Sequence, residues 1–198
     1  MQSFSKAIGL VFNHSPWAVA LFIALIYVAK IDAANDQEKP LKPQQLLARN
    51  AGTWDCDIKL FLKGPEAPPK NYKGIEDNKL VSGGKFLQTS FKYPMGPRRD
   101  FEGHSLIGYD PRSKRYVGTW VDTMTSAPSQ VSEEYDEAST TLTDHRTVVD
   151  GNGNEIKTKH ITTWQDDSRK KLEIFMVVKK DGKETDVRLM EIVATKRP

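Results

Sequence analysis

The chain has 198 residues, enough for one well-buried domain of about 150 residues plus an appendage and too few to require two cores. Its formal net charge is +3, and basic residues are interspersed with acidic ones, so the basic patch of a nucleic-acid-binding protein is missing. Cys56 is the only cysteine, which excludes an internal disulfide and with it a disulfide-stabilised scaffold.

The N-terminal part carries an uninterrupted apolar run at residues 17–29. This run is shorter than the roughly 20 residues that span a bilayer, but it matches the about 7–15 residues of a signal-peptide core. Small residues follow at Ala33 and Ala34, where a signal peptidase could cut. We predict a signal peptide over residues 1–34 and a periplasmic or secreted protein. The alternative is that residues 17–29 stay uncleaved and anchor the protein in a membrane. We expect no other part of the chain to contact a membrane.

A linker and a short helix are expected next. Residues 35–43 are polar and contain Pro40 and Pro43, which is typical of a tether. Residues 44–49 contain helix-forming side chains but are too few for a helix that is stable alone. We therefore expect one helical turn that covers one end of a domain spanning residues 44–198.

The first predicted strand shows the clearest pattern in the chain. It begins at Gly52-Thr53-Trp54 and then alternates apolar and polar side chains as far as Leu60. An alternation with period two is typical of a strand that has one face in the core and one in water. Cys56 lies on the apolar face, so we expect a buried, unreactive thiol.

Nine further β-rich runs follow, separated by turn sequences such as Asp110-Pro111 and Asp181-Gly182. The predicted strands are 53–62, 72–81, 84–93, 101–109, 115–123, 130–136, 139–149, 155–165, 171–179 and 184–195. Short turns favour antiparallel pairing of neighbours, and a meander of about ten strands avoids exposed edges most simply by closing into an up-and-down β-barrel. A two-sheet sandwich is the alternative architecture.

Alternation also predicts which side chains face the interior in the later strands. One inward set is Ile156, Thr158, His160, Thr162 and Trp164, and a second is Leu172, Ile174, Met176 and Val178. The last strand is ambiguous, because a set containing Leu189 and Glu191 competes with a set containing Met190 and Ile192. The first choice would make Glu191 a buried carboxylate that needs a partner. We expect Asp144 and the basic cluster at residues 169–171 to be solvated charges.

The Gly-x-Trp at residues 52–54, together with Lys196-Arg197 at the end of the chain, resembles the lipocalin and calycin superfamily. That resemblance implies a barrel in which Trp54 closes one end and a cation from the last strand, here Arg197 or Lys196, packs across the indole ring.

Four motifs narrow the resemblance. They are residues 80–88 (LVSGGKFLQ), 101–110 (FEGHSLIGYD), 116–122 (YVGTWVD) and 190–192 (MEI). Their order and spacing look like those of DUF1579, a bacterial family of unknown function, over about residues 45–197. The resemblance implies a lipocalin-like barrel and no established activity.

No sequence signature of a common hydrolase, metalloprotease, nucleotide-binding protein or zinc site occurs, so we assign no catalytic and no metal-binding residues. Trp120 and Asp122 could form a barrel mouth in which an aromatic wall and a carboxylate orient a ligand, and Tyr109 is a further candidate ligand-binding residue. They could equally pack the barrel wall, with Asp122 as an exposed residue at a strand end.

His160, beside Trp164, is the best single candidate for contact with a ligand, since the alternation directs it inward. The alternative is a structural histidine that hydrogen-bonds to Thr158 or Thr162. Axial ligation of a haem by His160 is a further hypothesis, although no cofactor is assigned. Glu191 completes the candidate ligand-binding residues.

The prediction is therefore an exported barrel that binds a small apolar or amphipathic molecule without catalysis. Two alternatives remain. One is an enzyme that uses a barrel-mouth carboxylate together with His160. The other is an envelope protein-interaction module whose barrel is solid and whose outer face docks a partner.

Overall fold

The computed structural model describes residues 42–198, except residues 65, 98 and 181. The predicted signal peptide or anchor and residues 35–41 of the linker lie outside the described residues. Residues 41–198 form one compact unit. It contains one helix and ten strands: α2 (Pro43–Asn50), β1 (Gly52–Leu60), β2 (Lys70–Val81), β3 (Phe86–Gly96), β4 (Arg99–Asp110), β5 (Arg115–Asp122), β6 (Ser129–Asp136), β7 (Thr141–Val149), β8 (Glu155–Asp166), β9 (Arg169–Lys180) and β10 (Lys183–Lys196).

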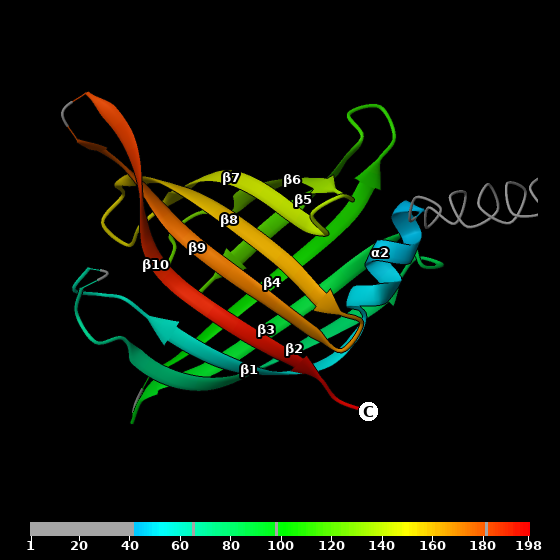
Figure 1. Cartoon of the computed structure of the whole chain (residues 1–198), viewed down its shortest axis with the longest axis horizontal. Coiled ribbons are helices and arrows are strands. Elements are labelled where there is room, and N and C mark those ends of the chain that lie inside the picture. The colour runs from blue at the N-terminus through cyan, green and yellow to red at the C-terminus, as the bar shows by residue number, and fades with distance from the viewer. Residues whose placement is uncertain (1–41, 65, 98, 181) are drawn as a thin grey trace, which may run out of the picture. The chain divides into compact units, whose positions relative to one another are not determined.

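The strands form a closed antiparallel barrel in which each strand pairs with its neighbours in the sequence (Figure 1). Pairing of β1 with β10, from Trp54 opposite Lys196 to Leu60 opposite Met190, closes the sheet. The predicted up-and-down barrel is confirmed, and the sandwich alternative is wrong. Strand boundaries differ from the predicted ones by at most the three residues at the end of β3, which reaches residue 96 and not 93.

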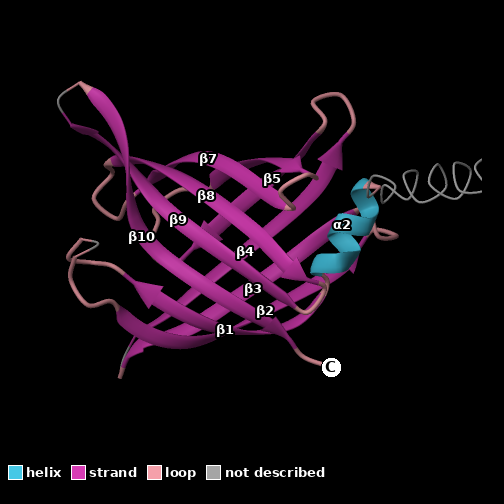
Figure 2. Cartoon of the chain, viewed as in Figure 1, coloured by secondary structure: helices cyan, strands magenta, loops and turns pink. Residues whose placement is uncertain are grey.

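Helix α2 has eight residues, longer than the predicted single turn, and lies across one end of the barrel (Figure 2). Pro43 stands in its first turn, and the Gln45 side chain accepts a hydrogen bond of 2.7 Å from the backbone N–H of Lys42. Leu46 and Leu47 are buried against a cluster that includes Tyr116 and Trp164. The Tyr116 hydroxyl donates to the Pro43 carbonyl at 3.1 Å. The helix therefore covers the barrel end, as predicted.

Trp54 is fully buried at this end. Its indole N–H donates to the Asn50 carbonyl at 3.0 Å, and the Lys170 and Lys196 ammonium groups lie 4.4 Å and 5.3 Å from its ring centroid. The resemblance named Arg197 or Lys196 as the packing cation. Lys196 fills this place, whereas Arg197 points outward and forms an ion pair with Asp55 at 2.6 Å. The difference follows from register: Lys196, the last residue of β10, pairs opposite the inward-facing Trp54, and the next residue, Arg197, points to the other side.

The predicted inward faces of β1 and β8 are confirmed. Cys56 is 2% exposed, and burial raises the pKa of its thiol to about 12, so it stays protonated. The ambiguity in the last strand has a structural cause. A β-bulge between Arg188 and Met190 resets the alternation at Leu189, so Met190 and Ile192 face inward.

Glu191 consequently lies on the outer face, where it forms an ion pair with Lys59 at 2.9 Å. Its placement inside the barrel is wrong. No helix within the described part of the chain is both long and apolar enough to cross a membrane.

Gly118 on β5 provides a test of strand packing. A Cβ atom at this position would lie 2.1 Å from the backbone oxygen of Leu106 on β4, and the backbone cannot move away without breaking the ladder. We expect Gly118→Ala to lower the free energy of unfolding by about 3 kcal/mol, measured by urea denaturation. Gly151→Ala is the matched control, because no atom lies within 4 Å of its added methyl group. Equal losses in the two variants would contradict the packing argument.

Candidate functional site

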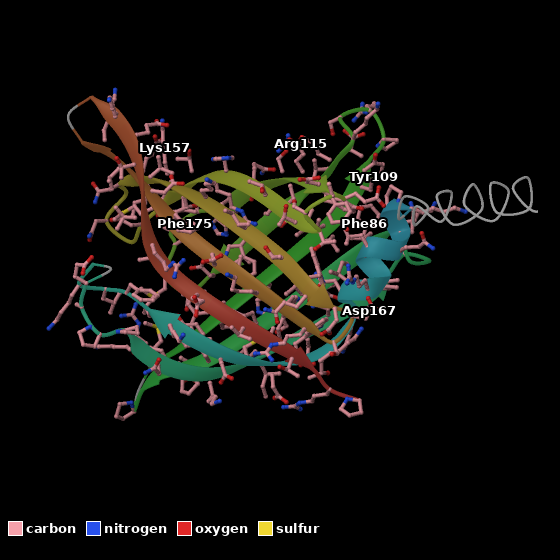
Figure 3. All side chains as sticks on the ribbon, in the orientation of Figure 1. Phe86, Tyr109, Arg115, Lys157, Asp167 and Phe175 are labelled. Carbon is pink, nitrogen blue, oxygen red and sulfur yellow. The ribbon has the colours of Figure 1, made fainter. Side chains whose placement is uncertain are left out.

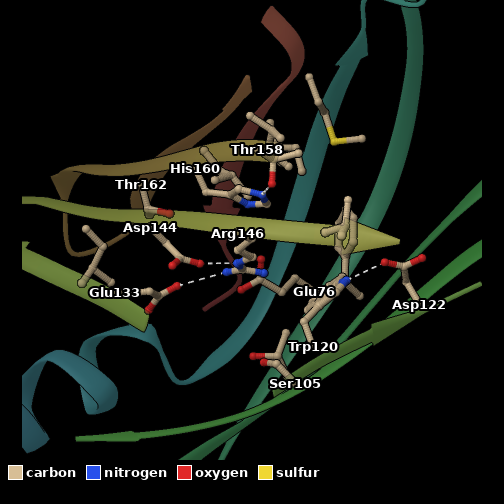
Figure 4. Close-up of a pocket in the computed structure, with 18 of the residues that line it drawn as sticks. Glu76, Ser105, Trp120, Asp122, Glu133, Asp144, Arg146, Thr158, His160 and Thr162 are labelled. Atoms are coloured by element: carbon tan, nitrogen blue, oxygen red, sulfur yellow. Dashed lines mark hydrogen bonds and ion pairs between the residues drawn. The ribbon is translucent and has the colours of Figure 1, made fainter. Parts of the chain in front are cut away.

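The barrel encloses a cavity of about 470 Å³. It reaches from Leu46 and Leu47 of α2 to the opposite mouth, where Leu62, Met124 and Leu189 line it. Figure 4 shows its central part.

One wall of the cavity is aromatic and comes from β3, β4 and β5. Tyr93 and Phe101 stack with their ring centroids 4.9 Å apart and an interplanar angle of 19°, and Phe91 contacts both rings. Trp120 continues this wall along β5. Gly103 makes room for it, since a Cβ atom there would lie 2.3 Å from the Trp120 ring. The result is a broad apolar surface suited to a flat molecule.

The facing wall is polar and comes from β6, β7 and β8. It is formed by Glu133, Asp144, Arg146, Thr158, His160 and Thr162 (Figure 4). Asp144 is 1% exposed and forms a close ion pair with Arg146, whose guanidinium also lies 3.6 Å from Glu133. The Asp144 carboxylate additionally accepts the backbone N–H of Ser132 at 3.1 Å. Backbone pairing between β6 and β7 ends at Glu134 opposite Thr143. The Ser132 N–H lies beyond this point, and the Asp144 carboxylate supplies the acceptor that β7 no longer offers.

Burial changes the protonation of two groups in this wall. It raises the pKa of Glu133 to about 7; Arg146 and Lys170 oppose this shift, and Asp144 adds to it. Burial also lowers the pKa of His160 well below its ordinary value, helped by Arg146 and His145. His160 is therefore neutral at pH 7, and its Nε2 lies 3.0 Å from the Thr158 hydroxyl.

A second buried ion pair lies nearer to α2. Lys170 donates to Glu76 at 2.6 Å and to the Asn50 side chain, in addition to its contact with the Trp54 ring. On the same side of the cavity, Trp164 is 3% exposed and its indole N–H has no hydrogen-bond partner among the described residues. The Arg49 guanidinium lies 5.7 Å from the Trp164 ring centroid.

The structure brings four of the predicted ligand-binding residues to the cavity: His160, Trp164, Trp120 and Asp122. Asp122 lies at the mouth opposite α2, where its carboxylate accepts the Trp120 indole N–H at 2.7 Å. It also accepts the backbone N–H groups of Met124 and Thr125 at 2.7 and 2.9 Å. This carboxylate therefore shapes the loop between β5 and β6.

The other two predicted residues do not line the cavity. Tyr109 lies at the α2 end (Figure 3), with its ring 5.2 Å from that of Tyr116. Glu191 lies outside, as described above. The sequence argument missed the interior charges Glu133, Asp144, Arg146 and Lys170. In β7 a signal exists, because Leu142, Asp144, Arg146 and Val148 share one period-two face.

Asp144 and Lys170 were expected to be solvated, and this expectation is wrong. The physical reason is the same for both: each points into a barrel wide enough to hold an ion pair. Within the described residues, no group of three or more His, Cys, Asp and Glu side chains could hold a metal ion.

Comparisons with known proteins agree with this fold. A family model described as a protein of unknown function, DUF1579, matches residues 39–196. No curated protein matches the chain. Among solved structures, an S-type phycobiliprotein lyase, CPES from Guillardia theta, is similar with a TM-score of 0.52 and 9% identity, covering 80% of this chain and 94% of the lyase. A redesigned β-barrel is similar with a TM-score of 0.42 and 10% identity, covering 81% of this chain and 100% of that barrel.

The Lys170–Glu76 pair should be a major contributor to stability. We expect Lys170→Met to lower the free energy of unfolding by about 3 kcal/mol, because Glu76 is left as a buried, unpaired carboxylate. The double variant Lys170→Met/Glu76→Gln should recover much of this loss. Lys171→Met is the control, since Lys171 is more exposed and pairs with Glu173. Urea denaturation measures all three. A double variant no more stable than Lys170→Met would contradict the explanation.

Glu133 should make stability depend on pH. Its pKa in the folded protein, about 7, lies above the ordinary value of 4.5, so the folded state keeps the proton over a wider pH range than the unfolded chain. The protonated carboxyl group therefore contributes to the free energy of unfolding. This contribution is fully present below pH 4.5 and is lost as the pH rises to about 7. We expect the stability of the wild type relative to Glu133→Gln to fall by roughly 3 kcal/mol between pH 4 and pH 8.

The control for this experiment is Glu134→Gln. Glu134 is the next residue on β6, faces outward and is 71% exposed beside Arg115. If the difference in the free energy of unfolding between wild type and Glu133→Gln does not change across this pH range, Glu133 is not a buried group that titrates near neutral pH.

Proposed function

We propose that this chain, which belongs to the DUF1579 family of proteins of unknown function, binds a small amphipathic molecule inside its β-barrel. The observation that carries the proposal is the cavity of about 470 Å³, with an aromatic wall on one side and a polar wall on the other. Its volume lies within the roughly 300–1,000 Å³ of typical small-molecule sites.

The distribution of polar groups supports binding of an amphipathic molecule over binding of a purely apolar one. A fatty chain alone would cover Glu133, His160 and Thr162 without offering them a hydrogen-bond partner, which is unfavourable. A molecule with a flat apolar body and a polar edge would satisfy both walls.

Two further parts of the sequence prediction enter the proposal. We propose that the protein acts outside the cytoplasm, on the strength of the apolar run at residues 17–29. We also propose that binding is not accompanied by catalysis. The enzyme hypothesis paired His160 with a carboxylate at the mouth, but within the described residues no hydrogen bond or ion pair joins His160 to Asp122, whose carboxylate already accepts three donors.

The interaction-module hypothesis required a solid barrel, and the cavity removes that premise. Exposed apolar side chains do occur on the outer face of β3, β4 and β5, at Phe86, Leu106, Val117 and Val121.

A large side chain that fills the cavity should weaken the binding of a small molecule. Thr162 faces inward between Leu142 of β7 and Leu172 of β9, so Thr162→Trp places an indole in the cavity. We expect the wild type to bind the neutral fluorescent probe N-phenyl-1-naphthylamine, and Thr162→Trp to bind it at least about tenfold more weakly, a loss of roughly 1.4 kcal/mol. Thr163→Trp is the control, because the next residue of β8 faces outward.

Fluorescence titration measures these affinities, and circular dichroism checks that each variant keeps its β structure. Native mass spectrometry of the protein from its own host should also detect a bound small molecule that Thr162→Trp lacks. Equal probe binding by Thr162→Trp and the wild type would overturn the proposal, and so would a wild type that binds no probe and carries no molecule.

A further inference from the structure

The cavity carries more negative than positive charge. Five acidic residues line it (Glu76, Asp122, Glu133, Asp144 and Asp150), against two permanent cations (Arg146 and Lys170). Both cations are already engaged: Arg146 contacts Asp144 and Glu133, and Lys170 contacts Glu76 and Asn50. An anionic group of a ligand would therefore find no available cation among the described lining residues.

Four of the five acids have close donors. Glu76 accepts from Lys170 at 2.6 Å, and Asp122 accepts the three donors described above. Asp144 accepts from Arg146 and Ser132, and Asp150 accepts backbone and side-chain donors of its own turn.

Glu133 differs from these four. Among the side chains that the structure describes, its one close charged contact is Arg146 at 3.6 Å, which is beyond hydrogen-bonding distance. It keeps 18% of its side-chain surface exposed and lines the cavity. With all three groups ionised, Glu133, Arg146 and Asp144 together carry one net negative charge, which a positive group beside Glu133 would balance.

A second unsatisfied group lies on the same wall. The buried indole N–H of Trp164 has no hydrogen-bond partner within residues 42–198 as described. The Trp164 ring centroid lies 6.4 Å from that of Tyr135, which is two residues from Glu133 on the same face of β6. A ligand that brings a positive group to Glu133 would supply the partner that this carboxylate lacks, whereas the Trp164 indole N–H is too buried for direct contact with a ligand in this structure.

We propose that the ligand of this cavity is a cationic amphiphile, whose flat apolar body lies against the aromatic wall of β3–β5 and whose protonated amine or other organic cation pairs with Glu133. This inference rests on the proposed function and specifies its ligand class. The Trp120 face adds a cation–π surface across the cavity. Asp122 and Asp150 give the mouth a negative charge that attracts such molecules.

Binding of a cation then competes with a proton on Glu133. The charged and titratable groups around Glu133 are Arg146 and Asp144 on β7, Lys170 on β9 and Tyr116 on β5, with the neutral His160 on β8 in the same wall. Because burial raises the pKa of Glu133 to about 7, its ionised fraction grows about tenfold between pH 6 and pH 8. Affinity for a permanent cation should rise with it.

The test uses thioflavin T, which is flat and permanently cationic, and N-phenyl-1-naphthylamine, which is neutral. We expect thioflavin T to bind the wild type with an affinity that rises about tenfold from pH 6 to pH 8. Glu133→Gln should bind it about tenfold more weakly at pH 8 and without pH dependence, whereas its affinity for the neutral probe should change much less, because that probe has no charge to pair with Glu133. Glu134→Gln should behave as the wild type, which excludes a general effect of surface charge.

The outcomes separate this inference from the proposed function. Binding of the neutral probe without binding of thioflavin T, or thioflavin T affinity that Glu133→Gln leaves unchanged, would overturn the cationic ligand and leave the binding function intact. Tighter binding of an anionic probe, 1-anilinonaphthalene-8-sulfonate, than of thioflavin T would overturn it as well. If the wild type binds neither the neutral nor the cationic probe and carries no molecule from its own host, the proposed function itself fails. Circular dichroism checks that Glu133→Gln keeps its β structure.

Discussion

Closure of the sheet between β1 and β10 is the constraint on which the rest of the molecule depends. A closed barrel has no exposed strand edge, and its diameter grows with the number of strands. Eight strands give an interior that side chains can fill, whereas ten give a wider one. Here the added width appears as a cavity that α2 covers at one end. The number of strands therefore leaves room for a cavity, and the small residue Gly103 lets the Trp120 ring lie close to the wall of this space.

The width also explains why the interior can hold charges. A buried ion pair is tolerated only where both partners, and the hydrogen-bonding atoms left over, find contacts. Lys170 meets this requirement through Glu76, Asn50 and the face of Trp54. Asp144 meets it through Arg146 and the backbone of Ser132. Glu133 does not meet it in full, and this difference separates a group with a structural role from one available to a ligand.

The fold could be predicted from the sequence because period-two alternation and turn residues are local signals, and ten of them in succession leave few architectures. The inward face of β8, with His160, followed from the same rule. The rule failed at Leu189. A β-bulge inserts one extra residue there and shifts the alternation, and the sequence pattern does not show where such a bulge occurs. For Asp144 and Lys170 the alternation itself holds, but the expectation that charged residues lie at the surface was wrong. The partner of Lys170, Glu76, lies 94 residues earlier in the chain, so only the folded barrel shows this ion pair. The partner of Asp144 is Arg146, two residues away on the same face of β7.

The incomplete pairing of Glu133 links stability to binding. In the empty barrel, ionisation of Glu133 destabilises the folded state, which is why burial raises its pKa. Replacing this residue with an uncharged one should therefore stabilise the protein above neutral pH, so packing alone does not account for a carboxyl group at this position. Residues that lower the stability of the empty fold are expected where a protein meets its ligand, because the ligand supplies the missing interaction and stabilises the bound state in proportion to its affinity. By this argument the polar wall, with Glu133 at its centre, is a better candidate for ligand recognition than the aromatic wall, whose side chains are already satisfied by packing against one another.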